Sequence, residues 1–445
     1  MRAHKDIQQL VDSIPLVDTH EHLWEEKRRV DAVAKGKDSG LWASDFGILL
    51  GHYTDSDLIV AGAPPESLKK VTGYDLSPEE KWKLIAPYYE KARHTGYLRC
   101  LRESVRILYG EEDLRADNVA RISGRIKEGV HPGFYKAILQ EISHIEYCHV
   151  NSLETDVFME TAQPELLAQD MSTVALVCVN NREELAERSG VKLSNLGDWH
   201  QVIDWCFAQY GPRAIALKNQ MAYQRRLDYA KVSKKDAEPL FLKRVTNEKS
   251  MTGEERKALE DHLFHYCLEK AQEYNLPVKL HTGYYAGHGG MPLERVRQNA
   301  GDLCPLLRAY PKVRFDLFHI GYPYHDEMIA LAKHYPNAWL DMCWAWIINP
   351  AASVRFLKEF LMAVPANKVF TFGGDYMPVE MVPGHAAIAR QGIAQALSEL
   401  VDDGWLADGE VPALADRLMR GNAHEVFDQA GKLAAWKKGH FENNR

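Results

Sequence analysis

Several features are absent from this sequence of 445 residues, and each absence excludes a class of protein. No apolar run approaches the roughly 18 residues that are needed to cross a bilayer. The first residues lack the apolar stretch of a signal peptide. We therefore expect a cytoplasmic protein with no membrane partner. The seven cysteines are scattered singly, with no CxxC pair, which indicates reduced and packed thiols rather than a disulfide framework.

Basic clusters, internal repeats and low-complexity linkers are also missing. The net charge is -8, whereas a protein that binds nucleic acid usually carries a basic stripe. We therefore expect no nucleic-acid partner. Hydrophobic residues make up 46% of the chain, enough for a large core. We expect residues 1–445 to form a single barrel domain.

Short apolar runs alternate with helix-like stretches along most of the chain. The eight runs cover residues 14–17, 142–148, 173–179, 214–217, 277–280, 313–318, 338–341 and 368–372. Near-continuous apolar strands that alternate with helices are typical of a parallel sheet covered by helices. Eight such units predict an α/β fold of the (β/α)8 TIM-barrel type. No glycine-rich dinucleotide fingerprint follows the first run, which argues against an open doubly wound sheet.

One long segment does not follow this alternation. Residues 23–140 are rich in Lys, Arg, Glu, Trp and Tyr, and parts of the segment have helical periodicity. Over residues 97–109 the apolar positions follow the spacing of three and four that an amphipathic helix requires. The sequence therefore predicts a large helical insertion after the first strand. An exposed insertion of this kind often serves assembly, and we expect a homo-oligomer.

A His-x-His pair ends the first apolar run. Side chains two apart on a strand point to the same side, so His20 and His22 would project together from the strand end. Two imidazoles aimed at one point can hold a divalent metal. Taken alone, the pair fits equally well two polar residues at a strand end.

Four later runs also end in residues that can take part in a metal site. These residues are Lys218, His281, His319 and Asp375. Each has a simpler interpretation by itself: a packed histidine, a turn-forming aspartate, or a lysine paired with a carboxylate. In a barrel, however, the C-terminal strand ends meet at one mouth, where chemistry takes place. Imidazole nitrogens together with a carboxylate oxygen suit zinc or a similar divalent cation.

The order His-x-His, Lys, His, His, Asp resembles that of the amidohydrolase superfamily. Three internal segments and one near the end of the sequence resemble one branch of this superfamily. That branch contains fungal developmental and nodulin-type proteins fused to glutamine synthetase. The four segments cover residues 216–227, 280–283, 319–324 and 420–427. Residues 93–99 of the insertion are also similar to a segment of uronate isomerases, which belong to the same superfamily.

The resemblance implies a metal held by His20, His22 and Asp375, with His281 or His319 joining it. It implies that Asp375 acts as general base and then general acid, and that His319 or the metal polarises a carbonyl. We expect zinc, although manganese or iron would also fit. In many relatives the lysine of the fourth strand is carboxylated and bridges two metals. Lys218 would therefore give two ions if carboxylated, and otherwise would bind a substrate carboxylate beside one ion.

Residues that follow the strands would line the substrate pocket. They are Tyr223, Arg225, Arg226, Tyr284, His288, Tyr322 and Trp344. Arginine suits capture of a carboxylate, and aromatic rings suit a sugar or another organic body. We therefore predict a metal-dependent hydrolase of an amide or related C–N bond in a small carboxylated substrate. The alternatives are a uronate-type isomerase, a nonoxidative decarboxylase, and a catalytically silent metal-binding scaffold.

Overall fold

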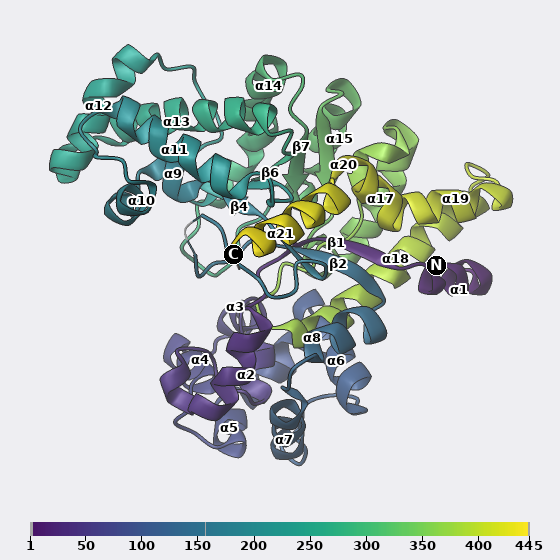
Figure 1. Ribbon diagram of the computed structural model, residues 1–445. Helices are drawn as coiled ribbons and strands as arrows, with labels where there is room; N and C mark the ends of the chain where they lie inside the picture. Colours follow the sequence, from purple (N-terminus) through teal and green to yellow (C-terminus); the bar gives the residue numbers. More distant parts are fainter. Residues whose placement is uncertain (1–2, 156, 444–445) are drawn as a thin grey trace.

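Short parallel strands surround the centre of the computed structural model, which describes residues 3–155 and 157–443 (Figure 1). Every paired strand runs parallel to its neighbour. The strands are β1 (Leu16–Glu21), β2 (Ile145–Val150), β3 (Leu167–Gln169), β4 (Met171–Ser172), β5 (Leu217–Asn219), β6 (Val278–His281), β7 (Phe315–Phe318), β8 (Ala338–Asp341) and β9 (Val369–Phe370). They pair in the orders β1-β2-β3 and β4-β5-β6-β7-β8-β9.

Backbone hydrogen bonds join these two sheets into a ring. Asp170 lies between β3 and β4, and its N–H donates to Val150 O at 2.8 Å. At the other junction, the N–H of Thr19 donates to Phe372 O at 3.0 Å, and the N–H of Asp375 donates to His20 O at 2.9 Å. With β3 and β4 taken as one interrupted strand, the ring has eight strands. The predicted (β/α)8 barrel is therefore confirmed.

The prediction was wrong for the third strand. Residues 173–179 were expected to form it, but they contain the helix α9 (Val174–Cys178), and the strand lies just before them at 167–172. Periodicity cannot separate a short buried helix from a buried strand, because both are apolar on every side. α9 packs against the long helix α13 (Gly253–Glu273), which explains why its apolar residues are buried without pairing in the sheet.

The segment between β1 and β2 is helical, as predicted for residues 23–140. It contains α2 (Glu26–Lys35), α3 (Thr54–Val60), α4 (Pro65–Thr72), α5 (Pro78–Ala92), α6 (Gly96–Tyr109), α7 (Val119–Gly129) and α8 (Phe134–Lys136). α6 coincides with the amphipathic pattern found at residues 97–109. In Figure 1 these purple-to-blue helices gather on one side of the strands, next to α18 (Val382–Asp402).

Other helices cover the barrel and follow its strands. They are α1 (Lys5–Ser13), α10 (Arg182–Ser189), α11 (Leu196–Tyr210), α12 (Lys234–Asn247), α14 (Asn299–Ala309), α15 (His325–His334), α16 (Ala345–Ile348), α17 (Pro350–Ala363), α19 (Val411–Asp416), α20 (Asn422–Val426) and α21 (Gln429–Asn443). Among the described residues, no helix combines the length and the apolar character that crossing a membrane requires.

The helical insertion is fixed to the barrel by the packing of α6 on α18. Gly384 lies at their closest approach, where an added Cβ would be 2.1 Å from the carbonyl oxygen of Cys100. The hydroxyl of Ser104 accepts a hydrogen bond from the N–H of Gly384 at 3.0 Å and donates to Met381 O at 3.2 Å. A side chain at residue 384 would therefore separate the two helices.

The barrel interior is apolar at one end and polar at the other. The apolar end, where the strands begin, is closed by side chains of the strands and of the segment that includes α20. This group consists of Val17, Tyr147, Ala168, Ile215, Ala216, Phe370, Ala423, Val426 and Phe427. Towards the C-terminal strand ends, the buried side chains are histidines, lysines and carboxylates. This polar end is the place where barrel enzymes carry their chemistry.

Candidate metal centre

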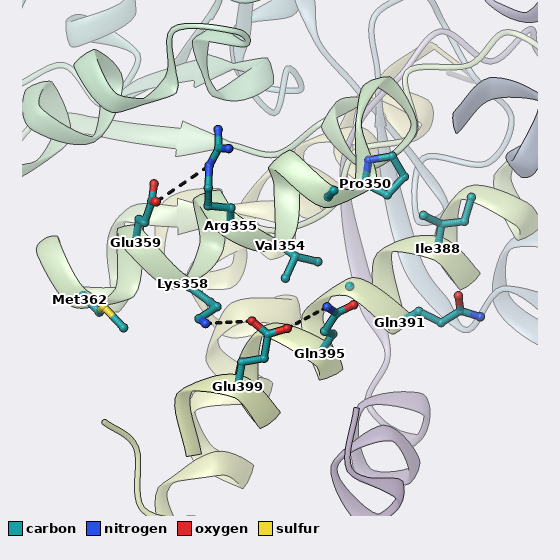
Figure 2. Close-up of a pocket in the computed structure, with 12 residues that line it drawn as sticks. Pro350, Val354, Arg355, Lys358, Glu359, Met362, Ile388, Gln391, Gln395 and Glu399 are labelled. Atoms are coloured by element: carbon teal, nitrogen blue, oxygen red, sulfur yellow. Dashed lines mark hydrogen bonds and ion pairs between the residues drawn. The ribbon is translucent and has the colours of Figure 1, made fainter. Parts of the chain in front are cut away.

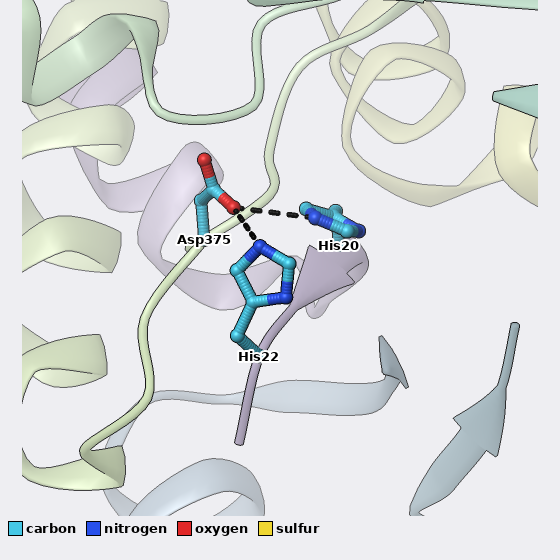
Figure 3. Close-up of side chains that lie close together, drawn as sticks. All are labelled: His20, His22 and Asp375. Atoms are coloured by element: carbon cyan, nitrogen blue, oxygen red, sulfur yellow. Dashed lines mark ion pairs between the residues drawn. The ribbon is translucent and has the colours of Figure 1, made fainter. Parts of the chain in front are cut away.

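Three predicted ligands converge at the end of β1. The Nε2 atoms of His20 and His22 each lie 3.2 Å from the same oxygen, Oδ1 of Asp375 (Figure 3). All three side chains are buried. The period of two along β1 brings the imidazoles together, and the hydrogen bond from Asp375 N–H to His20 O holds the carboxylate beside them. The spacing of the His-x-His pair thus predicted its geometry correctly.

A backbone carbonyl fixes the tautomer of His22. Its Nδ1 lies 2.6 Å from Asn151 O, and a carbonyl can only accept, so Nδ1 carries the proton. The Nε2 atom of the neutral ring then has a lone pair, and this lone pair faces the Asp375 carboxylate oxygen. Two acceptors at 3.2 Å repel each other unless a cation or a proton lies between them.

The same conflict occurs between His281 and His319, at the ends of β6 and β7. His281 donates from Nε2 to Tyr284 O at 2.8 Å, and His319 donates from Nδ1 to Cys343 O at 2.9 Å. The two remaining nitrogens, His281 Nδ1 and His319 Nε2, are 3.0 Å apart and both present lone pairs. His319 Nε2 is also 3.9 Å from Oδ2 of Asp375.

Burial keeps the imidazoles of His20, His281 and His319 neutral near pH 7. Burial and the neighbouring Lys218 lower the pKa of His20 to about 4, and burial is the main cause that lowers the pKa of His319 to about 3. The pKa of His281 is also well below its ordinary value. A proton therefore does not relieve the opposed lone pairs of His281 and His319, whereas a divalent cation would. This donor set fits a metal ion such as zinc.

Lys218 lies inside the barrel on β5, not at an exposed strand end. It is 1% exposed, and its ammonium has no hydrogen-bond partner among the described residues. Its Nζ is 3.6 Å from the centre of the Phe318 ring. Burial is the main cause that lowers the pKa of Lys218 to about 8. The neutral amine is the form of a lysine side chain that can react with CO2, and the lowered pKa makes this form accessible to Lys218.

Beneath the His20 ring is an ion pair that sequence reasoning missed. Lys279 donates to both oxygens of Asp170 at 2.9 Å and to Thr19 O at 2.8 Å. Oδ2 of Asp170 in turn lies 3.8 Å from Nδ1 of His20. Such outer partners orient metal-binding histidines. The sequence did contain a hint of this position, because Lys279 lies two residues before His281 and therefore points to the same side of β6.

Buried carboxyl groups outnumber buried lysines in this part of the barrel. Burial raises the pKa of Asp18 to about 6 and that of Asp341 to about 7, and it raises the pKa of Glu21 and Asp316 as well. Both oxygens of Asp316 lack a hydrogen-bond partner among the described residues. A bound divalent cation would supply positive charge to this interior, so its electrostatics agree with the ligand geometry.

Comparison with known proteins finds one matching family model and several similar folds. Residues 250–429 match the amidohydrolase family model, a range that includes His281, His319 and Asp375. The fold is similar to uronate isomerase from Thermotoga maritima (TM-score 0.75, 15% identity, 95% of this chain and 96% of that one). It is also similar to a protein from Lactobacillus casei assigned as a metal-dependent hydrolase (TM-score 0.63, 16% identity, 97% and 99%).

The family match is thus confined to residues 250–429, while the likeness to these solved structures extends over nearly the whole fold. Glucuronate isomerase from Caulobacter crescentus has the same fold (TM-score 0.73, 18% identity, 95% of this chain and 93% of that one). Protein fluG of Emericella nidulans is 26% identical over 243 residues, which are 52% of this chain. That match spans only 27% of the fungal protein's length.

Two residues of the helical insertion lie close to Asp375 and His22. Tyr53 donates its hydroxyl proton to Asp375 O at 2.7 Å. The ring of the preceding His52 lies 5.7 Å from that of His22, and its Nδ1 accepts from the N–H of Met377 at 3.2 Å. Sequence reasoning missed both, because they lie outside the strand ends and follow no metal-binding spacing.

Four predicted substrate-binding residues lie around the centre. The Tyr223 ring is 4.5 Å from that of His281, and the Trp344 ring is 5.2 Å from that of His319. Tyr284 is 5.7 Å from Trp344 and 6.3 Å from Tyr322, again between ring centres. These aromatic side chains form a wall beside the predicted metal ligands.

The structure does not bring the two predicted arginines into this group. Arg225 forms ion pairs with Asp261 and, at 3.3 Å, with Glu260. Arg226 pairs with Asp302 at 2.6 Å. Their charges are already balanced by carboxylates of α13 and α14, which the sequence pattern could not reveal. The remaining predicted residue, His288, is exposed in the glycine-rich loop after β6.

Proposed function

We propose that this protein is a metal-dependent hydrolase that cleaves an amide or related C–N bond in a small carboxylated substrate. One observation carries the proposal: the imidazoles of His20, His22 and His319 lie 3.2, 3.2 and 3.9 Å from the Asp375 carboxylate. The fourth imidazole, of His281, lies 3.0 Å from that of His319, and carbonyls hold His22, His281 and His319 in tautomers that direct lone pairs inward. Neutral imidazoles and a carboxylate around one point are the ligand set of a hydrolytic metal site.

His20, His22 and Asp375 would hold the metal, with His281 or His319 completing its coordination. We propose zinc, which such a set binds readily. When bound, the ion would lower the pKa of water towards neutrality and polarise a carbonyl. Lys218 would bridge a second ion if it is carboxylated. Otherwise its ammonium, which lacks a partner among the described residues, would bind a substrate carboxylate beside a single ion.

Asp375 is suited to move the proton. Its Oδ1 faces the His20 and His22 pair, while its Oδ2 is directed towards His319, so one oxygen stays available to the reaction. A cation held by His20, His22 and Asp375 would favour the ionised form of this carboxyl group. Asp375 would therefore be ionised at neutral pH and could take a proton from water and return it to a leaving amine.

His319 fits a role as ligand or proton acceptor better than the carbonyl-polarising role that its place in the sequence suggested. Its Nδ1 proton is engaged by Cys343 O, so its Nε2 has no proton to donate to a substrate carbonyl. The aromatic wall of Tyr223, Tyr284 and Trp344 would pack against the organic part of the substrate.

A sugar-acid isomerase of the uronate type is the second candidate. Its support is the common fold with uronate isomerases over 95% of the chain. The buried Lys218 favours the hydrolase, because the resemblance gives uronate isomerases one metal and no lysine on the fourth strand. A nonoxidative decarboxylase would need a closely similar ligand set and ranks third. A silent metal-binding scaffold ranks last, because every expected ligand position is intact.

A substrate screen separates the candidates. Purified protein loaded with zinc or manganese is assayed with γ-glutamyl and N-acyl amides, and separately for interconversion of glucuronate and fructuronate. Amide hydrolysis supports the proposal, whereas sugar-acid interconversion without amide turnover would replace it with the isomerase. Anomalous scattering at the zinc edge counts the ions, and density on Lys218 shows whether it is carboxylated.

Two substitutions test the ligand assignment. We expect His20→Ala and Asp375→Asn each to abolish turnover, and His20→Ala also to lower the bound metal measured by elemental analysis. His334→Ala, on the exposed end of α15, is the matched control and should retain both metal and activity. Full metal content and activity in His20→Ala would contradict the assignment.

A further inference from the structure

The segment that carries Asp375 is an irregular loop, and its backbone is held from several sides. The loop covers residues 373–377, after β9, and Figure 3 shows Asp375 on it beside His20 and His22. Asp375 has a φ of 62°, in the left-handed region. A residue other than glycine adopts this conformation at a cost in free energy and keeps it only where the surrounding structure fixes it. The contacts of the loop therefore decide where the Asp375 carboxylate lies.

Strand β1 holds one side of this loop. The N–H of Asp375 donates to His20 O at 2.9 Å, and the N–H of Tyr376 donates to the Glu21 carboxylate at 2.6 Å. These bonds tie the loop to the strand that carries the His-x-His pair. They leave the carbonyl oxygen of Asp375 and the N–H of Met377 to other elements of the fold.

The helical insertion holds the other side through two adjacent residues. The hydroxyl of Tyr53 donates to Asp375 O at 2.7 Å, and the N–H of Met377 donates to Nδ1 of His52 at 3.2 Å. His52 has a φ of 78°, so it is left-handed as well. Strained backbone of this kind gathers at functional sites. Here it brings both insertion side chains to the loop that carries Asp375.

A stack of aromatic rings keeps Tyr53 in place. Its ring is 2% exposed and stacks on Trp344 at 4.6 Å, with an angle of 22° between the ring planes. It also stacks on His52 at 4.2 Å and on Tyr97 at 5.4 Å, between ring centres. Rings packed in this way restrict the rotation of the side chain. The Tyr53 hydroxyl therefore stays directed at the carbonyl oxygen of Asp375.

Helix α18 supports both the loop and the insertion. His385 of α18 donates from Nδ1 to Gly374 O at 3.1 Å, and the insertion packs on α18 through α6. α18 also packs against α17 along a groove of about 610 Å³ (Figure 2). There Glu399 of α18 pairs with Lys358 of α17 at 2.8 Å and accepts from Gln395 at 2.8 Å. The helix on which the insertion docks is thus itself fixed to the barrel.

We propose that Tyr53 and His52 are positioning residues of the metal centre. They hold the Asp375 backbone in the conformation that turns its carboxylate towards His20 and His22. The helical insertion thereby completes the site without contributing a metal ligand. The inference rests on the metal site proposed above. It also gives the insertion a regulatory role, because a movement of the insertion would release Asp375 and lower the affinity for the metal.

The metal affinity of the full chain tests the proposal. Protein freed of metal with a chelator is titrated with Zn²⁺ in competition with a chromophoric chelator, and separately with Co²⁺, whose visible absorption reports the ligand geometry. Tyr53→Phe keeps the ring and removes only the hydroxyl. We expect it to weaken Zn²⁺ binding by about 10-fold to 100-fold and to change the Co²⁺ spectrum.

A pair of substitutions at His52 gives a rescue test. His52→Ala removes the acceptor of the Met377 N–H and should also weaken Zn²⁺ binding. His52→Asn should restore most of the affinity, because its Oδ1 can accept the same hydrogen bond and asparagine tolerates the left-handed conformation.

Two control variants make each outcome decisive. Tyr89→Phe removes a hydroxyl that is buried in the insertion and donates to Asp113, so it should leave the Zn²⁺ affinity unchanged. Asp375→Asn alters the ligand itself and should weaken binding at least as much as Tyr53→Phe. Melting temperatures within a few degrees of wild type show that the variants are folded.

The outcomes separate the positioning role from the metal site on which it rests. Wild-type affinity and an unchanged Co²⁺ spectrum in Tyr53→Phe would overturn the positioning role, provided that Asp375→Asn weakens binding. An equal loss in Tyr89→Phe, or no recovery in His52→Asn, would overturn it as well. Wild-type affinity in Asp375→Asn would overturn the metal site, and the positioning role with it.

Discussion

The ion pair between Lys279 and Asp170 predicts a large effect far from any substrate contact. Both side chains are 0% exposed, and the pair is joined by two contacts of 2.9 Å. Burial alone would raise the pKa of Asp170, but Lys279 and His20 outweigh it and hold the pKa at about 2. In Lys279→Met the carboxylate stays buried without its cation. Breaking such a pair from one side costs about 3–5 kcal/mol of unfolding free energy.

Urea unfolding followed by circular dichroism measures this loss. The double variant Lys279→Met with Asp170→Asn removes both charges, and we expect it to recover most of the stability. Lys69→Met serves as the control. Lys69 pairs with Glu66 at 3.0 Å, but both side chains are about three quarters exposed, so we expect a change below about 1 kcal/mol.

Metal affinity gives a second and independent readout. Because Asp170 lies 3.8 Å from Nδ1 of His20, a disturbed Asp170 should weaken metal binding by about 10-fold to 100-fold. The double variant should retain this defect even where its stability recovers. A Lys279→Met protein that loses less than about 1 kcal/mol, or a double variant with wild-type metal affinity, would refute the reasoning.

Two further predictions concern stability. Burial is the main cause that lowers the pKa of His200 to about 4. Between pH 6.5 and pH 4 the unfolded chain therefore binds a proton that the folded chain does not, and the free energy of unfolding decreases as the pH is lowered. The variant His200→Phe keeps an aromatic ring on Tyr266, which His200 stacks on at 4.0 Å. We expect it to reduce the loss of stability between pH 7 and pH 4.5, measured by urea unfolding at both pH values, by up to about 2 kcal/mol. An unchanged pH dependence would contradict this expectation. We expect Gly384→Ala to cost about 1–3 kcal/mol because its Cβ would meet a backbone oxygen of α6, whereas Gly409→Ala, with open space around it, should change the melting temperature little.

The strand ends of the site could be predicted from the sequence, because local chemistry determines them. The period of two along β1 places His20 and His22 on one side, and apolar strands that alternate with helices place Asp375 at the same mouth. The third strand could not be located in the same way, since the run containing Val174–Cys178 is apolar in every direction and tertiary packing made it a helix.

Contacts across the fold limited the rest of the sequence analysis. Arg225 was assigned to the substrate pocket from its place after a strand, but Asp261 on α13 holds it. The ion pair of Lys279 could not be predicted although this residue precedes His281 by two positions, because a lysine inside an apolar run carries no metal-binding pattern. His52 lies in an insertion whose docking on the barrel depends on α6 and α18, and no local spacing predicts that contact.

The hydrogen bonds that close the barrel have a consequence for how the protein is made. The N–H of Tyr376 donates to the Glu21 carboxylate across 355 positions of the chain, next to the one from Asp375 to His20. During translation, the first two of the three proposed metal ligands therefore leave the ribosome long before the third exists. Tight metal uptake should occur only after ring closure, so the metal content of a preparation reports the fraction of molecules whose barrel is complete.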